Sequence, residues 1–191
     1  MGRRLCWISV AGQALLKKAA NHDQFQRIVG VDVSDEALAV ARRELAPRIG
    51  DEEGRVSLIS ASYLDDKLQL ADFDAAVLVE TIEHLDPRRL SMLERTLFVA
   101  HRPATIVVTT PNREYNVLYG VEAGEVRDPD HRFDGTRIKL RAWAFRIFRE
   151  YGYRVTFGLG NIGEAPPAFG TPTQAARFTR DEGFLGARQV G

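Results

Sequence analysis

Short runs of apolar and β-branched residues alternate along this chain with segments whose apolar residues recur every three or four positions. The runs before position 110 are Leu5–Val10, Ile28–Val33, Val56–Ser60, Ala75–Val79 and Thr105–Thr109. Nearly continuous apolar strands are typical of a parallel sheet that is covered on both faces. The pattern therefore predicts an α/β fold with a doubly wound, mostly parallel sheet.

Helix start signals stand between these runs. Ser34 is a capping residue for a helix that ends before Pro47, and Asp86-Pro87 combines a cap with a proline at the first helical position. The second helix is expected to bury Leu90, Leu93, Leu97 and Phe98. A third helix is predicted over 140–151, where apolar residues recur at spacings of three and four.

In the last third of the chain, the pattern predicts two strands that are joined by a loop and not by a helix. Tyr153–Leu159 and Ala175–Arg180 read as strands joined by a loop rich in Gly and Pro, so they should pair antiparallel. Five βα units followed by an antiparallel hairpin is the order of the seven-stranded, Rossmann-like methyltransferase fold. We expect one domain over 1–180, with a diverged or truncated start over 1–14 and a disordered tail at Asp181–Gly191.

Composition narrows the functional class. The chain has 191 residues, 45% of them apolar, and a formal net charge of zero. Zero net charge argues against a bulk electrostatic nucleic-acid binder, but it permits a local basic face. The single Cys6 allows no intrachain disulfide and fits a reducing compartment. No apolar run approaches a membrane span, so we expect a cytoplasmic protein without a membrane partner.

The most informative polar stretch is Glu80-Thr81-Ile82-Glu83-His84, which directly follows the fourth predicted strand. If it begins a helix, Glu83 and His84 can both face a point near the Glu80 carboxylate. A second imidazole, His131, comes later in the chain. Two carboxylates and two imidazoles suit Mg²⁺ or Mn²⁺ better than a closed zinc site. Each residue alone also fits a solvated helix turn or an ordinary loop histidine.

A nucleotide-like cofactor is indicated by Asp32, which ends the second strand, where an acid commonly accepts hydrogen bonds from ribose hydroxyls. The first strand-to-helix turn should carry Gly-x-Gly, but residues 9–16 keep only Gly12. The cofactor site is therefore expected to be altered at this turn. Gly12, Ser62 and Glu80 are the other candidate cofactor contacts.

Three segments together resemble the small-RNA 3′-terminal 2′-O-methyltransferases, the family named after the plant HUA-enhancer protein. The segments are 80–85, 110–116 and 130–137, and the similarity runs from about Leu15 to Arg180. The resemblance implies that Glu80, Glu83, His84 and His131 bind a divalent metal. It also implies that Asp32 holds the ribose of S-adenosylmethionine.

The chain departs from that family at two places. The glycine-rich first turn is not intact, and Gly135 stands where the family usually has tryptophan. Bacterial members usually work with an RNA-repair kinase-phosphatase, which makes such an enzyme an expected partner alongside the 3′ end of RNA. In bacterial members an N-terminal region works with that enzyme, and we do not expect such a region in this sequence.

The mechanism expected from these residues is metal-assisted methyl transfer to the 2′-hydroxyl of a 3′-terminal nucleotide. A metal would lower the pKa of that hydroxyl, and either His84 or His131 could accept its proton. Competing interpretations are a metal-independent small-molecule methyltransferase and a non-catalytic RNA-binding module with a degenerate cofactor site. A nicotinamide oxidoreductase is disfavoured by the terminal hairpin and the missing Gly-x-Gly.

Several residues flank the predicted site. Thr109–Asn112 ends the fifth strand, where it could line the site or simply form a capped turn. Arg113, Arg132 and Arg137 could contact RNA phosphates, although each is equally consistent with an ordinary surface arginine.

Overall fold

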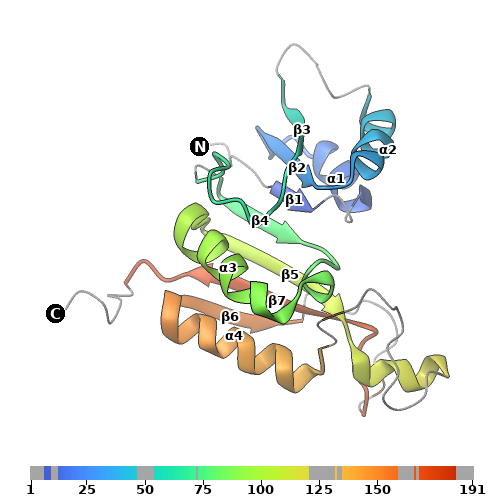
Figure 1. Cartoon of the computed structure of the whole chain (residues 1–191), viewed down its shortest axis with the longest axis vertical. Helices are drawn as coiled ribbons and strands as arrows, with labels where there is room; N and C mark the ends of the chain where they lie inside the picture. Colours follow the sequence, from blue (N-terminus) through green and yellow to red (C-terminus); the bar gives the residue numbers. More distant parts are fainter. Residues whose placement is uncertain are drawn as a thin grey trace. The chain divides into compact units, whose positions relative to one another are not determined.

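The computed structural model describes residues 7–9, 13–46, 54–71, 73–120, 132, 135–158, 166 and 168–183. The chain divides into two compact units (Figure 1). One unit takes in 1–79 and 92–106, and the other takes in 80–91 and 107–191. The chain therefore passes into the second unit after Val79, returns after Ser91, and leaves the first unit again after Ile106.

The first unit is built on parallel strands. They are β1 (Trp7–Ser9), β2 (Ile28–Asp32), β3 (Val56–Ser60) and β4 (Ala75–Leu78), in the spatial order β3-β2-β1-β4. Trp7 pairs with Val29 on one side and with Ala76 on the other, which fixes β1 between β2 and β4. Because all these pairs are parallel, the carboxyl ends of the strands meet at one edge of the sheet.

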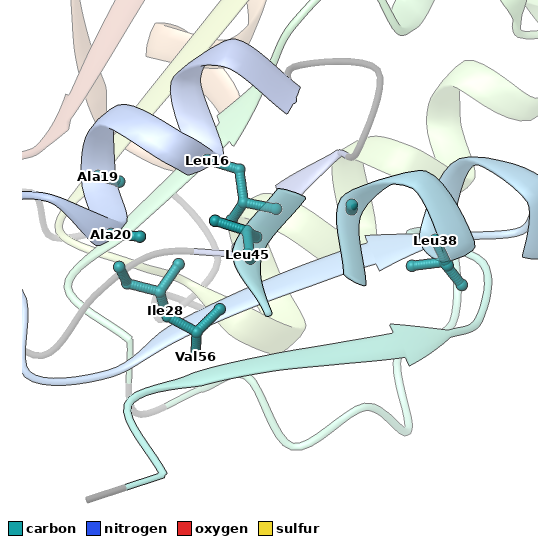
Figure 2. Packing of buried hydrophobic residues seen from close by; sticks show 8 residues of the cluster. Leu16, Ala19, Ala20, Ile28, Leu38, Leu45 and Val56 are labelled. Carbon is teal, nitrogen blue, oxygen red and sulfur yellow. The ribbon is translucent and has the colours of Figure 1, made fainter. Parts of the chain in front are cut away.

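Two helices cover β2 and β3 with apolar side chains. Helix α1 spans Gln13–Ala20 and helix α2 spans Asp35–Leu45. The Ser34 hydroxyl accepts the N–H of Ala37 at 3.1 Å, as its capping role predicts. Figure 2 shows the buried cluster that results, in which Leu16, Ala19, Ala20, Leu38, Leu45, Ile28 and Val56 are labelled. Burying each large side chain of this kind stabilises the fold by about 1.5–3 kcal/mol. The cluster therefore fixes β2, and with it the residue at its carboxyl end.

The helix predicted after Asp86-Pro87 exists, but it is not uniform. A 3₁₀ turn (Pro87–Arg89) leads into α3 (Leu90–Arg95), which continues as a π-helical segment (Thr96–His101). Leu93, Leu97 and Phe98 are buried, as predicted, whereas Leu90 is only half-buried. Arg102 adopts a left-handed φ of 44°, and its N–H donates to the Leu97 carbonyl at 2.9 Å. That bond reaches back five residues, which is the spacing of a π turn.

The second unit contains the antiparallel hairpin. Its strands are β5 (Thr105–Pro111, whose first residues belong to the first unit), β6 (Tyr153–Phe157) and β7 (Thr173–Arg180), in the spatial order β5-β7-β6. Tyr153 pairs with Arg180 and Phe157 with Ala176, so β6 and β7 run antiparallel. The hairpin predicted from the sequence is confirmed. A 3₁₀ helix (Arg113–Tyr119) follows β5.

Helix α4 (Arg137–Tyr151) lies along this hairpin (Figure 1). Thr136 caps its start by accepting the Lys139 N–H at 3.3 Å, and Gly152 ends it with a φ of 71°. The Trp143 ring meets the Phe178 ring edge-on, with 5.4 Å between their centroids. The predicted amphipathic stripe packs on β6 and β7 through its buried residues, which are Leu140, Trp143, Ala144 and Ile147. Phe148, which belongs to the same predicted stripe, is exposed, so the buried face is narrower than predicted.

The observed strand bounds differ from the predicted ones. Strands β5 and β7 are each longer by two residues, and the Asn112 N–H donates to the Pro172 carbonyl at 2.8 Å just beyond the ends where they meet. Strand β6 ends at Phe157, before the predicted end at Leu159, and β2 and β4 each end one residue earlier than predicted. In the predicted tail, the Asp181 N–H donates to the Gly152 carbonyl at 2.9 Å, and 184–191 lie outside the described residues. No helix among the described residues has the length and apolar character needed to cross a membrane.

Candidate active site

Asp32 lies at the carboxyl end of β2 in the first unit, where the sequence predicted it. Its Oδ1 accepts the N–H of Ser34 at 2.9 Å, and its backbone carbonyl accepts the N–H of Ala61 at 2.9 Å. These bonds tie the end of β2 both to the start of α2 and to the residue after β3. A half-buried carboxylate fixed in this way can accept hydrogen bonds from the vicinal hydroxyls of a ribose.

Serine hydroxyls accompany Asp32 at the ends of β2 and β3. Ser60 donates its hydroxyl to the Asp35 carboxylate at 2.9 Å, and the Ser62 hydroxyl accepts the Leu64 N–H at 3.2 Å. Ser62, a predicted cofactor contact, thus lies just beyond β3 on a locally fixed turn. Gly12, the other predicted contact in this unit, lies outside the described residues together with the altered first turn.

Glu80 opens the acidic turn of the second unit with a left-handed backbone. Its φ is 46°, a conformation that costs a non-glycine residue about 1–3 kcal/mol. Its N–H donates to the Thr109 carbonyl at 3.1 Å and to the Thr109 hydroxyl at 3.2 Å. These bonds to β5 offset the strain and direct the chain into the turn. Strained residues of this kind cluster at functional sites.

The turn after Glu80 corrects the helical prediction. Ile82–His84 form a single 3₁₀ turn, closed by the Leu85 N–H bonding to the Ile82 carbonyl at 3.2 Å. Glu83 is buried, with 1% of its surface exposed, whereas His84 is exposed. The α-helical argument for placing Glu83 and His84 on one face with Glu80 is therefore wrong.

The structure leaves the predicted metal ligands in two groups. Glu80, Glu83 and His84 are described, and His131 lies outside the described residues. Where the structure describes the chain, no group of three or more His, Cys, Asp or Glu side chains could hold a metal ion. The three described ligands therefore do not form a complete site by themselves.

The buried Glu83 carboxylate has a partner that the sequence did not reveal. The Thr110 hydroxyl donates to its Oε2 at 3.1 Å, and Thr110 is fully buried. The two residues are 27 positions apart. The segment that holds Thr110 was expected either to line the site or to form a capped turn, and it does form the turn: the Asn112 side chain accepts the Glu114 N–H at 3.1 Å.

The residue after His131 contacts the same turn. The Arg132 N–H donates to the Glu83 carbonyl at 2.6 Å. Nearby, hydrogen bonds from the Arg88 side chain and backbone lower the pKa of the Asp86 carboxyl well below its ordinary range, and the Arg132 charge acts in the same direction. Asp86 therefore stays ionised beside the turn.

A buried network of amides fixes the other segments of the second unit. The Gln174 side chain donates to the Pro111 carbonyl at 3.1 Å and to the Gly135 carbonyl at 2.7 Å. The Asn112 side chain donates to the carbonyls of Phe169 and Thr171 at 2.7 and 2.9 Å. The sequence did not reveal that Gln174 contributes to this network. Its one signal is that it is a polar residue in the apolar pattern of the last strand.

Arg137, a candidate phosphate contact or ordinary surface arginine, has several partners within the second unit. Its guanidinium forms an ion pair with the Glu114 carboxylate at 2.6 Å and donates to the Ala168 carbonyl at 2.7 Å. Its backbone N–H also donates to Glu114, at 2.9 Å. Arg137 therefore joins the start of α4 to the 3₁₀ helix after β5. For Arg113, Arg132 and Arg137, phosphate binding stays a prediction.

Comparisons with known proteins bear on what this arrangement does. A family described as methyltransferase domain matches residues 11–101. The small RNA 2′-O-methyltransferase of Mus musculus is 33% identical over 183 residues, which are 92% of this chain and 46% of the mouse protein. The chain thus spans about half the length of the first curated relatives that it matches.

Solved structures agree with these relatives. The methyltransferase domain of a bacterial Hen1 protein has a TM-score of 0.79 and 36% identity, covering 93% of this chain and 90% of that domain. The small RNA methyltransferase HEN1 has a TM-score of 0.78 and 29% identity, covering 92% of this chain and 23% of that protein. The fold is therefore the Rossmann-like methyltransferase fold, with a mixed sheet.

Proposed function

We propose that this chain, which belongs to the small RNA 2′-O-methyltransferase family, transfers a methyl group from S-adenosylmethionine to a ribose 2′-hydroxyl of RNA. The observation that carries the proposal is the similarity to the bacterial methyltransferase domain. That similarity runs over nearly the whole of both chains. Methyltransferase structures that are only 12–16% identical cover as much of this chain but with TM-scores of 0.60 and 0.64, so the 36% identity and the TM-score of 0.79 are what favour the small RNA family.

Most of the proposed cofactor contacts belong to the first unit, and Glu80 belongs to the second. We propose that Asp32 accepts hydrogen bonds from the ribose of S-adenosylmethionine, with Gly12, Ser62 and Glu80 as further contacts. The support for Asp32 is its position at the end of β2, fixed by the Ser34 N–H. The methyltransferase family match covers this part of the chain.

We further propose that Glu80, Glu83, His84 and His131 together hold a divalent cation, Mg²⁺ or Mn²⁺. Carboxylate and imidazole donors are the ligands such a cation accepts in proteins. The Arg132 N–H bond to Glu83 supports the set, because it joins the segment that follows His131 to the acidic turn. When bound, the cation would supply positive charge that favours loss of a hydroxyl proton.

The proposed reaction transfers the methyl group and removes the proton of the 2′-hydroxyl. The 2′-oxygen attacks the methyl carbon, the bond from that carbon to the sulfonium sulfur breaks, and S-adenosylhomocysteine leaves. The hydroxyl proton passes to an imidazole, and His84 and His131 are the two candidates. The ring that accepts the proton uses its one free lone pair, so it does not ligate the cation in that step. The exposure of His84 gives its ring a route to pass that proton on to water.

The proposed acceptor is the 3′-terminal nucleotide. Only a 3′ end with both hydroxyls free presents a vicinal pair of oxygens to a cation, and the 2′-oxygen separates RNA from DNA. A terminal 3′-phosphate would remove one of these oxygens. This specificity depends on the cation, so one experiment tests both.

The proposal for the whole sheet is that β1 to β7 form the single seven-stranded sheet of this methyltransferase fold. The similarity to the bacterial domain over 93% of the chain supports it. An RNA-repair kinase-phosphatase partner and a cytoplasmic location are further proposals, which rest only on the family resemblance.

Transfer of a labelled methyl group to short oligonucleotides tests the function. The substrates should end in 2′-OH/3′-OH ribose, in a 3′-phosphate or in deoxyribose, and each should be assayed with a chelator or with added Mn²⁺. We expect label only on the RNA with both hydroxyls free, and only with Mn²⁺. Glu83→Ala should abolish transfer, whereas Glu150→Ala, which removes an exposed glutamate of α4, should not.

Other outcomes would contradict separate parts of the proposal. Full methylation in the presence of the chelator would remove the cation from the mechanism. Equal labelling of the 3′-phosphate RNA would remove the 3′-terminal specificity. Absence of S-adenosylmethionine binding by calorimetry would instead indicate a non-catalytic binding module.

A further inference from the structure

Two adjacent threonines of β5 hold two acidic residues of the turn. Thr109 accepts the Glu80 N–H through its carbonyl and its hydroxyl, and Thr110 donates its hydroxyl to the Glu83 carboxylate at 3.1 Å. The first contact fixes a backbone, whereas the second fixes a side chain. Thr110 therefore acts on the orientation of a carboxylate that is proposed to bind a cation.

Burial makes this contact selective for one orientation. Thr110 has none of its surface exposed and Glu83 has 1% exposed, so bulk water does not compete for their hydrogen bond. Threonine is also restricted at χ1, so its hydroxyl is presented with little rotational freedom.

We propose that Thr110 is a positioning residue for methyl transfer, which orients the Glu83 carboxylate through the bond to Oε2. The inference rests on the proposed function, because it assigns Glu83 to the cation. Partners of ligating carboxylates and histidines fix ligand orientation, and their loss typically weakens metal binding or activity by about 10–100-fold.

The test compares three substitutions at one position. Thr110→Val keeps the shape of the side chain but removes the donor, Thr110→Ala removes both, and Thr110→Ser restores the donor. Thr156→Val, on an exposed position of β6, is the matched control. Calorimetry would measure the Kd for Mn²⁺ and, separately, for S-adenosylmethionine, and circular dichroism would confirm folding.

We expect Thr110→Val and Thr110→Ala to raise the Kd for Mn²⁺ by about 10–100-fold. Thr110→Ser and Thr156→Val should match the wild-type protein, and the Kd for S-adenosylmethionine should be unchanged in all of them. In the transfer assay, the Mn²⁺ concentration for half-maximal rate should rise in parallel with the Kd.

The opposite results are equally informative. If Thr110→Val and Thr110→Ala bind Mn²⁺ like the wild type, or if Thr110→Ser is as impaired as Thr110→Val, the positioning role is wrong while the proposed function stands. If the wild-type protein itself binds no Mn²⁺, the cation part of the proposed function fails, and the role of Thr110 fails with it.

Discussion

We expect a single carboxylate, that of Asp32, to contribute much of the cofactor affinity of the first unit. Asp32→Ala should weaken S-adenosylmethionine binding by about 10–100-fold, because a hydrogen bond to a charged group contributes about 1.5–3 kcal/mol and 1.4 kcal/mol is tenfold in Kd. Calorimetric titration would measure the Kd. Glu36→Ala, which removes an exposed acid from the first turn of α2, is the control and should bind normally. An unchanged Kd for Asp32→Ala would remove this residue from the cofactor site.

The chemistry of single residues was more predictable than their orientation. Asp32 could be predicted because an acid directly after an apolar strand marks a strand end. The turn at Glu83 could not, because a 3₁₀ turn and an α-helix begin with the same residue types. The contact between Thr110 and Glu83 could not be predicted from the sequence. It joins β5 to a 3₁₀ turn 27 positions earlier, and only folding brings the two together.

Among the elements, β7 holds the second unit together through one buried amide. Gln174→Leu would remove both hydrogen bonds from its side chain, to the carbonyls of Pro111 and Gly135. Each buried acceptor left without a bond costs about 1–3 kcal/mol, and Gly135 keeps its bond from the Arg113 N–H. We expect the free energy of unfolding to fall by about 1–3 kcal/mol, measured by urea titration.

The control for this change lies on the exposed face of the same strand. Thr179→Leu should alter the free energy of unfolding by no more than about 0.5 kcal/mol, because surface substitutions away from special contacts have small effects. A Gln174→Leu protein as stable as Thr179→Leu would show that the two carbonyls find other donors.

Elements with strong local signals were predicted well, and those shaped by distant contacts were not. The caps at Ser34 and Asp86 and the apolar stripe of α4 follow from nearby residues, and all are confirmed. The π-helical segment that ends at His101 has no comparable signal. Its geometry depends on closure by Arg102, a residue type that rarely adopts a positive φ.

At the scale of the whole molecule, the proposed functions are divided between the two units. Asp32 and Ser62 belong to the first unit, and Glu80, Glu83 and His84 belong to the second. Variants of Asp32 should therefore impair cofactor binding alone and variants of Glu83 cation binding alone, whereas Glu80 is proposed to take part in both. This separation is why a Kd for S-adenosylmethionine and a Kd for Mn²⁺ together distinguish a damaged site from an unfolded protein.

Stability of the whole protein should depend on pH through His101. The side chain is 2% exposed, and burial lowers the pKa of its imidazole. A hydrogen bond to the Asp65 backbone and the charges of Asp66 and Asp65 act in the opposite direction without cancelling the effect of burial. In the unfolded chain the same imidazole titrates near its ordinary pKa of about 6.5.

The sign of the effect follows from which state binds the proton first. As the pH falls below about 6.5, the unfolded state takes up a proton that folded His101 still resists, so the free energy of unfolding decreases until the pH reaches the folded pKa. One such proton contributes at most about 1.4 kcal/mol per pH unit.

Urea titrations at several pH values between about 7.5 and 5 would measure how the free energy of unfolding changes with pH. We expect the slope of that free energy against pH to be smaller for His101→Gln than for the wild type. Thr96→Val, a buried and non-titrating change in the same π-helical segment, should lower stability equally at every pH. Identical slopes for the wild type and His101→Gln would mean that this imidazole titrates alike in both states.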